Sequence, residues 1–188
     1  PRALKIEVGA YPTFETAIDA AKDAAHIAVD IPIGLGERGG RACDLLARQA
    51  LGARWMCVFP APPRPILEAP SYAEAGRLHR DLCGKGLSRQ AWRIVPKIAE
   101  VDHYLRSRPG SAERVWEVHP ELCFAALNGG VPLVLGKATK DGLRARRALL
   151  RRSVAGLDAA VEAALKGWPR RTLKEDDVLD EVVASLGW

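Results

Sequence analysis

The chain has 188 residues, of which 48% are hydrophobic and 27% charged, so it is long enough for a sizeable core and ordinary for a globular protein. It contains no run of about 18 apolar residues and opens with no signal segment, so we expect a cytoplasmic protein without a membrane span. The formal net charge of +5 permits an anionic partner, such as a nucleic acid or nucleotide, without requiring one.

The cysteines and histidines argue against a zinc site. Cys43, Cys57, Cys83 and Cys123 are widely separated, and no Cys-x-x-Cys pair occurs. This spacing excludes the common zinc-finger patterns. The four histidines also lack the spacing of helical zinc ligands. We therefore expect no zinc, and free thiols in a reducing compartment.

Strands and helices alternate in the first part of the sequence. The expected elements are a half-buried strand over 3–8, a helix from its cap Thr13 to about residue 25, a buried strand over 26–29, a helix over 41–51 and an extended segment over 54–59. The buried strand delivers Asp30 to its carboxyl end, where a loop rich in proline and glycine begins. The helix over 41–51 is expected to place Leu45, Leu46 and Ala50 inward.

The later part of the sequence is mostly helical. The expected elements are a capped helix from Ser71 to about Cys83, a helix from Ser88 to Leu105 with a possible bend at Pro96, a strand over 114–118, a short helix from Pro120, helices over 140–153 and 157–168, and a last helix from Thr172 through Leu186. Strands that alternate with helices indicate an α/β layer fold. Residues 1–188 are expected to form one domain, in which 60–110 is a helical insertion.

Carboxylates stand at the ends of several elements. Asp30 ends one strand, Glu117 lies in another, and Asp177 and Asp180 share one face of the last helix. Acids from separate strands and a helix are the oxygen ligands that a pair of Mg²⁺ ions needs for phosphodiester cleavage. The alternative is structural: an acid caps a turn, or lies in the first turn of a helix where it suits the helix dipole.

Several charged side chains also allow two interpretations. Arg41, Asp44 and Arg48 lie on one helical face, which either presents cations to a phosphate or carries an exposed ion pair. Lys97, Glu100 and Asp102 form either a binding face or an ordinary solvated helix face.

His119 and Lys137 are similarly ambiguous. His119 follows an acid-bearing strand and either relays a proton or has a structural role. Lys137 precedes a helix and either contacts phosphate or points into solvent.

A series of short motifs runs through the chain in order. They are Asp30-Ile-Pro-Ile-Gly-Leu, Gly40-Arg41-Ala-Cys43-Asp44 with Ala47-Arg48, Leu51-Gly52, Val58-Phe59, Gly86-Leu87-Ser88-Arg89-Gln90, Pro96-Lys97-Ile98-Ala-Glu100-Val-Asp102, Glu117-Val118-His119-Pro120-Glu121, Lys137, Gly142, Arg146 and Asp176-Asp177-Val-Leu-Asp180. From Asp30 onward, this series resembles the prokaryotic family called domain of unknown function 429, whose members are often described as predicted nucleases with an RNase H fold.

The resemblance implies a mixed RNase H-like sheet flanked by helices and a metal-dependent nuclease that uses Mg²⁺ or Mn²⁺. Asp30 would match the acid of the fourth strand, Glu117 would lie on the fifth, and Asp177 and Asp180 would match paired aspartates of the last helix. The first, central strand with its aspartate is expected to be missing from this chain, because residues 1–8 look like the third strand. Further motif residues are expected to bind substrate around one cleft: Arg41, Asp44, Arg48, Lys97, Glu100, Asp102, His119, Glu121 and Lys137.

Two other functions stay open at the level of sequence. One is a small-molecule phosphohydrolase or nucleotide-handling protein that uses Arg41 and Lys97 in a closed pocket. The other is a non-catalytic binding protein on an RNase H-like fold, suggested by the missing first-strand aspartate. A nuclease assignment that rests on fold alone is an analogy.

Overall fold

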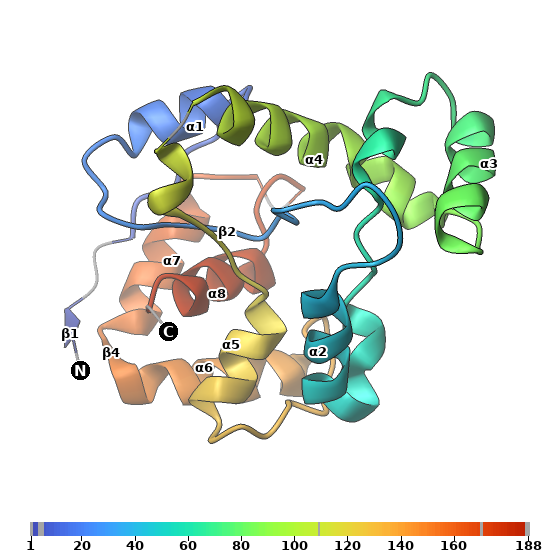
Figure 1. Ribbon diagram of the computed structural model, residues 1–188. Helices are drawn as coiled ribbons and strands as arrows, with labels where there is room; N and C mark the ends of the chain where they lie inside the picture. The colour runs from blue at the N-terminus through green and yellow to red at the C-terminus, as the bar shows by residue number, and fades with distance from the viewer. Residues whose placement is uncertain (1, 4–5, 109, 170, 187–188) are drawn as a thin grey trace. The chain divides into compact units, whose positions relative to one another are not determined.

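The computed structural model describes residues 2–3, 6–108, 110–169 and 171–186 (Figure 1). The chain divides into two compact units, which are described separately below. Unit 1 comprises Pro1–Ala10, Leu51–Arg54 and Val118–Trp188, and unit 2 comprises Tyr11–Ala50 and Trp55–Glu117. Helices predominate and the strands are short and parallel, which confirms the α/β class. Within the described ranges, no helix is both long and apolar enough to cross a membrane.

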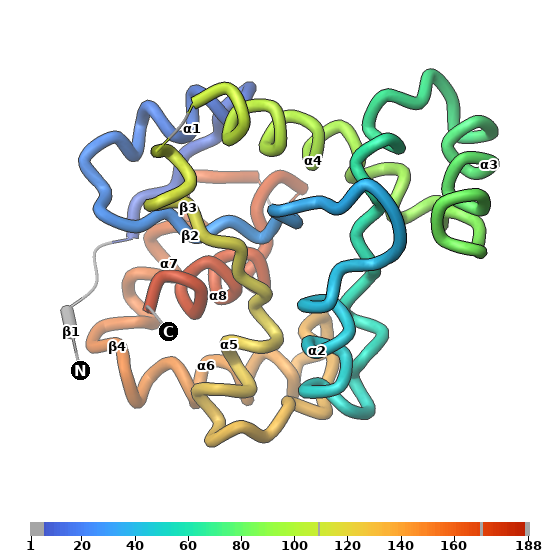
Figure 2. The backbone as a smooth tube through the Cα atoms, in the orientation of Figure 1, coloured from blue at the N-terminus to red at the C-terminus, as the bar shows by residue number. Residues whose placement is uncertain are grey.

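Unit 2 is built around one parallel pair of strands. Its elements are α1 (Phe14–Ala20), β2 (Ile27–Val29), most of α2 (Ala42–Leu51), the 3₁₀ helix η2 (Arg64–Glu68), α3 (Tyr72–Cys83), α4 (Arg89–Ser107), the 3₁₀ helix η3 (Ser111–Glu113) and β3 (Val115–Glu117). Strands β2 and β3 lie side by side (Figure 2), and the register pairs Ile27 with Val115 and Val29 with Glu117. Helix α1 packs on α4, and Ile18 and Tyr104 from these helices form a buried cluster with Val115.

Short-range signals set the starts of the helices in unit 2. The hydroxyls of Thr13, Ser71 and Ser88 accept backbone N–H groups of α1, α3 and α4, which confirms these predicted caps. Helix α4 continues through Pro96 to Ser107. Helix α3 ends at Cys83 and is capped by Gly84, whose φ of 71° is a left-handed conformation that glycine adopts without strain.

Unit 1 is centred on its last helix, α8 (Glu175–Ala184). Its other regular elements are β1 (Arg2–Ala3), α5 (Pro120–Leu127), α6 (Lys140–Ser153), β4 (Val154–Ala155) and α7 (Leu157–Lys166). Strand β1 pairs in parallel with β4. Helices α5, α6 and α7 all pack on α8, whose Leu179 and Val183 are completely buried (Figure 1). The predicted bounds of α6 and the predicted starts of α5 and α7 are confirmed.

Two predicted extended segments differ from the structure. The strand over 3–8 includes Leu4 and Lys5, which lie outside the described residues; the flanking residues are strand at Arg2–Ala3 and irregular at 6–8. The segment over 54–59 is largely the 3₁₀ helix η1 (Gly52–Cys57), which directly follows α2. A helix end commonly tightens into such turns to satisfy its last carbonyl groups.

The last helix begins later than predicted. The Thr172 cap is wrong, because the N–H groups of Thr172 and Leu173 both donate to the carbonyl of Pro169 and close a turn there. Helix α8 starts at Glu175 instead, and the carboxylate of Asp177 accepts the N–H of Lys174 at 2.9 Å. The predicted end at Leu186 is two residues too late, since the helix stops at Ala184 and its cap residue is Ser185.

The predicted inward face of α2 is also wrong. Leu45 and Leu46 are 59% and 63% exposed, and Ala50 is exposed too, whereas Asp44 is buried. The buried position goes to Asp44 because its carboxylate has partners inside unit 2, and these are described below.

Unit 1 contains a close backbone contact that only glycine allows. A methyl group added to Gly142, in the first turn of α6, would lie 2.0 Å from the carbonyl oxygen of Gly136. We expect Gly142→Ala to lower the free energy of unfolding by about 2 kcal/mol or more, because the backbone must move apart. Urea denaturation measures this change.

Gly167 provides a matched control in the same unit. It has right-handed backbone angles at the end of α7, and the nearest atom to an added methyl group would be 3.9 Å away. Gly167→Ala should change stability by less than about 1 kcal/mol. Equal effects of the two substitutions would contradict the proposed clash.

Candidate functional site

The main charged site of unit 2 is the Arg41 cluster, which we define as Arg41, Asp44 and Glu117. Arg41 immediately precedes α2, Asp44 lies in the first turn of α2, and Glu117 is the last residue of β3. A separation of three residues places Arg41 and Asp44 together, and the sheet brings Glu117 to them. The cluster therefore brings together two motifs that lie far apart in the sequence, one containing Arg41 and Asp44 and the other beginning at Glu117.

The guanidinium of Arg41 is held on all sides. It donates to both oxygens of Glu117, at 2.5 and 2.8 Å, and to both oxygens of Asp44. It also donates to the carbonyl of Ile33 at 2.7 Å, while the Ile33 N–H donates to Glu117 at 2.8 Å. Asp44 accepts a further hydrogen bond from the Ala61 N–H at 2.9 Å. A guanidinium that donates to both oxygens of a carboxylate forms one of the stronger kinds of ion pair.

The charge of Arg41 is fixed by its surroundings. Burial alone would lower the pKa of its guanidinium, but the hydrogen bonds and charges of Glu117 and Asp44 outweigh burial and raise it. Arg41 therefore stays protonated, and each of its nitrogens donates to the protein. This arrangement supports an ion pair with a structural role more than a cation open to a phosphate.

Asp30 lies at the same edge of the sheet as Glu117. Val29 is paired with Glu117, and Asp30 follows Val29 as an exposed residue. The carboxyl ends of β2 and β3 therefore coincide, and ligands of open α/β sheets commonly bind beyond such an edge.

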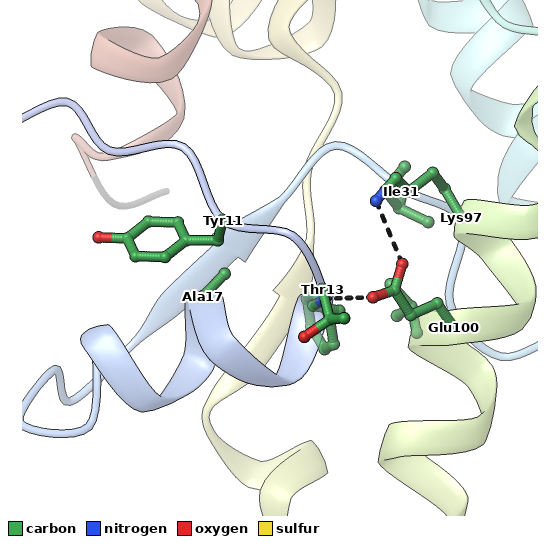
Figure 3. A pocket seen from close by; sticks show the side chains of 8 residues that line it. Tyr11, Thr13, Ala17, Ile31, Lys97 and Glu100 are labelled. Carbon is green, nitrogen blue, oxygen red and sulfur yellow. Dashed lines mark hydrogen bonds and ion pairs between the residues drawn. The ribbon is translucent and has the colours of Figure 1, made fainter.

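A small pocket in unit 2 contains two of the predicted substrate residues. It has a volume of about 200 Å³ and lies among the start of α1, Ile31 and α4 (Figure 3). Lys97 and Glu100 line it and pair with each other at 3.2 Å. Glu100 also accepts the N–H of Phe14, so it satisfies the first turn of α1. That hydrogen bond, together with Lys97, lowers the pKa of Glu100 against the opposing effect of burial.

The other predicted substrate residues of unit 2 are bonded within the protein. Asp102 accepts from Arg64 at 3.1 Å, and Arg64 also pairs with Glu37. Arg48 donates to the carbonyl of Val58 at 2.8 Å and lies over the ring of Trp55. No sequence pattern identifies Arg64, because it stands among prolines, outside any periodic pattern.

Unit 1 contains a second group of charges, the α8 cluster: Glu121, Lys137, Arg146, Asp176 and Asp180. The ammonium of Lys137 lies 2.6 Å from Asp180 and 3.9 Å from Asp176. Arg146 is completely buried and donates to Glu121 at 2.6 Å. Arg54 approaches the same oxygen of Glu121 at 3.5 Å. Arg54 and Arg146 are additions to the predicted site residues.

The two members of the Lys137–Asp180 pair differ in burial. Burial raises the pKa of Asp180, although the hydrogen bond and charge of Lys137 act in the opposite direction. Burial would lower the pKa of Lys137, but Asp180, followed by Asp176 and Asp177, raises it. The lysine is thus held as a cation beside a carboxylate that water reaches poorly.

The remaining predicted residues serve the starts of helices. Asp177 accepts the N–H of Lys174 at the beginning of α8, as a first-turn acid commonly does. His119 is the cap residue of α5, and its carbonyl accepts the N–H of Leu122 at 2.9 Å. The sequence alternatives for both residues included such structural roles.

The four predicted metal ligands come from both units: Asp30 and Glu117 from unit 2, Asp177 and Asp180 from unit 1. Among the described residues, no group of three or more His, Cys, Asp or Glu side chains is arranged to hold a metal ion. Carboxylate oxygens are nevertheless the donors that Mg²⁺ and Mn²⁺ prefer. Arg41 and Ile33 use three of the roughly four acceptor positions of Glu117, so one metal contact remains chemically possible there.

The Arg41 cluster makes a direct prediction about stability. Arg41→Ala would leave Asp44 buried without its cation, and we expect the free energy of unfolding to fall by about 3 kcal/mol. Chemical denaturation measures the loss. Arg38→Ala, an exposed arginine of the same loop, should change it by less than about 0.5 kcal/mol. A loss no larger than that of the control would contradict the role given to Arg41.

Glu100 makes a second prediction, about pH. Because folding lowers its pKa, its stabilising effect is present above the ordinary carboxylate pKa of about 4.3 and is lost as the pH falls through the lower folded value. Glu100→Gln should cost about 1 kcal/mol near neutral pH, and the difference from the unsubstituted protein should shrink in acid. The exposed Glu68→Gln is the control; a pH-independent difference for Glu100→Gln would refute the assignment.

Comparison with known proteins identifies the family of the chain but no individual relative. Neither a curated protein nor a solved structure matches the chain significantly. The family model described as "Protein of unknown function (DUF429)" matches residues 3–187, which is nearly the whole chain. The chain therefore belongs to the DUF429 family.

Proposed function

We propose that this protein is a cytoplasmic, metal-dependent nuclease that hydrolyses phosphodiester bonds with Mg²⁺ or Mn²⁺. The observation that carries the proposal is the parallel pairing of β2 with β3, which gives Asp30 and Glu117 a common carboxyl edge. In an RNase H-like sheet these strands would be the fourth and fifth, and we propose that arrangement for this chain, with 60–110 as a helical insertion. The fold family alone gives only an analogy for function.

Within unit 2, Asp30 and Glu117 are proposed to hold the metal. Asp177 and Asp180 of unit 1 stay candidate ligands predicted from the sequence. A bound divalent ion would activate water and neutralise charge on the phosphoryl oxygens. The protein's own part is to fix the acids. Arg41 orients Glu117 through both carboxylate oxygens, and Lys137 holds Asp180. Arg41 and Lys137 are therefore proposed as positioning residues.

A small-molecule phosphohydrolase is supported less well. That function needs Arg41 and Lys97 in one closed pocket. The pocket that contains Lys97 is lined by residues other than Arg41, and about 200 Å³ is small beside typical ligand pockets of roughly 300–1,000 Å³. In addition, Lys97 is paired with Glu100, and the nitrogens of Arg41 are used within the protein.

The test uses two exposed aspartates that flank β2. We expect the unsubstituted protein to cleave DNA or RNA only with Mg²⁺ or Mn²⁺ present, and Asp30→Asn to reduce the rate by roughly 100-fold or more, because a metal ligand is lost. Asp23→Asn removes the same charge from the other end of the strand and should leave the rate unchanged.

The assay should include single- and double-stranded DNA and RNA, each with Mg²⁺, with Mn²⁺ and with a chelator. Cleavage by Asp30→Asn at the rate of Asp23→Asn would reject the proposed role of Asp30. Binding of nucleic acid without cleavage under any of these conditions would favour the non-catalytic alternative.

A further inference from the structure

The pocket of unit 2 is intermediate in size between a water site and a typical ligand pocket. Its volume of about 200 Å³ greatly exceeds the ~15 Å³ that one water molecule needs, and it falls below the roughly 300–1,000 Å³ of typical ligand pockets. Its lining comes from α1 and the segment before it, from Ile31 and from α4, all within unit 2. The pocket therefore suits a single planar ring better than a whole nucleotide.

The walls of the pocket are mostly apolar and partly aromatic. Phe14 is fixed in one wall, because its ring meets Tyr104 edge to face with 5.3 Å between the ring centroids. Tyr11 lies on the side opposite Lys97 and Glu100 (Figure 3) and is 48% exposed. An exposed aromatic ring beside an apolar pocket is a surface on which a base can stack.

One polar edge interrupts these apolar walls. The carboxylate of Glu100 accepts the N–H of Phe14 and pairs with the ammonium of Lys97 at 3.2 Å. These two bonds use about two of its roughly four acceptor positions. Lys97 is 58% exposed and donates, among the described residues, to Glu100 alone, so it has N–H groups left for a ligand. The pair therefore presents an acceptor next to a donor and carries no net charge.

A nucleobase has the matching arrangement on its pairing edge, where a hydrogen-bond donor lies next to an acceptor. Proteins read the pairing edges of unstacked bases with polar side chains and hold the faces of those bases with aromatic rings. Because the Glu100–Lys97 pair is neutral overall, it suits an uncharged base better than a phosphate group. The position also fits, since Ile31 in the pocket lining directly follows Asp30, and successive Cα atoms are only about 3.8 Å apart.

We propose that this pocket binds one unpaired base of a single-stranded nucleic acid, with Tyr11 against the face of the base and Glu100 and Lys97 at its pairing edge. This inference rests on the proposed function, because it names the substrate class of the same site. It adds that the substrate is single-stranded. In a duplex the pairing edge is occupied and the faces are stacked, so a base enters such a pocket only at the cost of unpairing and unstacking.

The experiment measures binding in the presence of a chelator, so that metal-dependent cleavage does not interfere. Fluorescence anisotropy follows a labelled single strand of mixed sequence and, separately, the same strand annealed to its complement, both at one fixed salt concentration. We expect the unsubstituted protein to bind the single strand at least about tenfold more tightly than the duplex.

Two alanines of α1 provide matched variants. Ala17 lines the pocket, whereas Ala20 is exposed at the end of the same helix. Ala17→Leu fills the pocket without changing any charge, so it should weaken single-strand binding by about tenfold and leave duplex binding unchanged. Ala20→Leu should bind both probes as the unsubstituted protein does.

Two lysines test the polar edge of the pocket. Lys97→Met and Lys85→Met each remove one ammonium from an exposed lysine of unit 2, so both reduce the general attraction to phosphates. Lys97→Met should lose more affinity for the single strand than Lys85→Met, because it also loses the donor to the base. This pair decides the question if Ala17→Leu does not fold.

Equal single-strand affinity of Ala17→Leu and Ala20→Leu would overturn the proposal, as would an equal loss of single-strand and duplex binding in Ala17→Leu. Tighter binding of the duplex by the unsubstituted protein would overturn it too. None of these measurements depends on catalysis. Failure of the nuclease proposal would appear as absent cleavage with the Ala17 effect on single-strand binding intact, so the two failures can be told apart.

Discussion

The guanidinium of Arg41 connects segments of unit 2 that are far apart in the sequence. It bonds directly to the loop after β2, to the first turn of α2 and to the end of β3, and through Asp44 it reaches the main chain at Ala61. A buried cation is tolerated only where opposite charges and hydrogen bonds satisfy it. Two carboxylates meet that need here, so polar contacts anchor the loop between β2 and α2 in addition to the apolar packing of its Leu35.

Unit 1 meets the same constraint in a different way. Its buried arginine, Arg146, donates from its two terminal nitrogens to Glu121 and to the carbonyl groups of Leu135 and Gly142, while its buried Nε has no hydrogen-bond partner among the described residues. Arg146 also lies over the ring of Phe124, which ties the charged group to the apolar core. The rigid, planar guanidinium of arginine suits such permanent positions. The flexible side chain of Lys137 in the α8 cluster, which is 44% exposed, suits them less well. Both units thus contain arginines with fixed partners, and the carboxylates that pair with these arginines have few hydrogen-bond acceptor positions left for a ligand.

Sequence predicted the features that depend on nearby residues. The caps at Thr13, Ser71 and Ser88, the bounds of α6 and the strand over 115–117 follow from local hydrogen bonding and periodicity. The predicted cap at Thr172 is wrong because a local turn competes with the helix. The N–H groups of Thr172 and Leu173 donate to the carbonyl of Pro169 in that turn.

Long-range features were harder to predict from sequence. The inward face of α2 was wrong because the partners of Asp44 include a main-chain N–H far along the chain, which periodicity does not encode. For the same reason the sequence identified Glu117 and Asp180, and separately Arg41 and Lys137, but not the pairing of each acid with its cation. The convergence of Asp30, Glu117, Asp177 and Asp180 on one metal stays a prediction.

The order of elements in unit 1 has a consequence for its biosynthesis. Helices α5, α6 and α7 all pack on α8, which comes last among them. Since a ribosome releases the chain from its N-terminal side, the first three helices emerge with their apolar faces uncovered until α8 follows. During that interval the nascent chain exposes surface that invites aggregation, and binding by a chaperone would protect it.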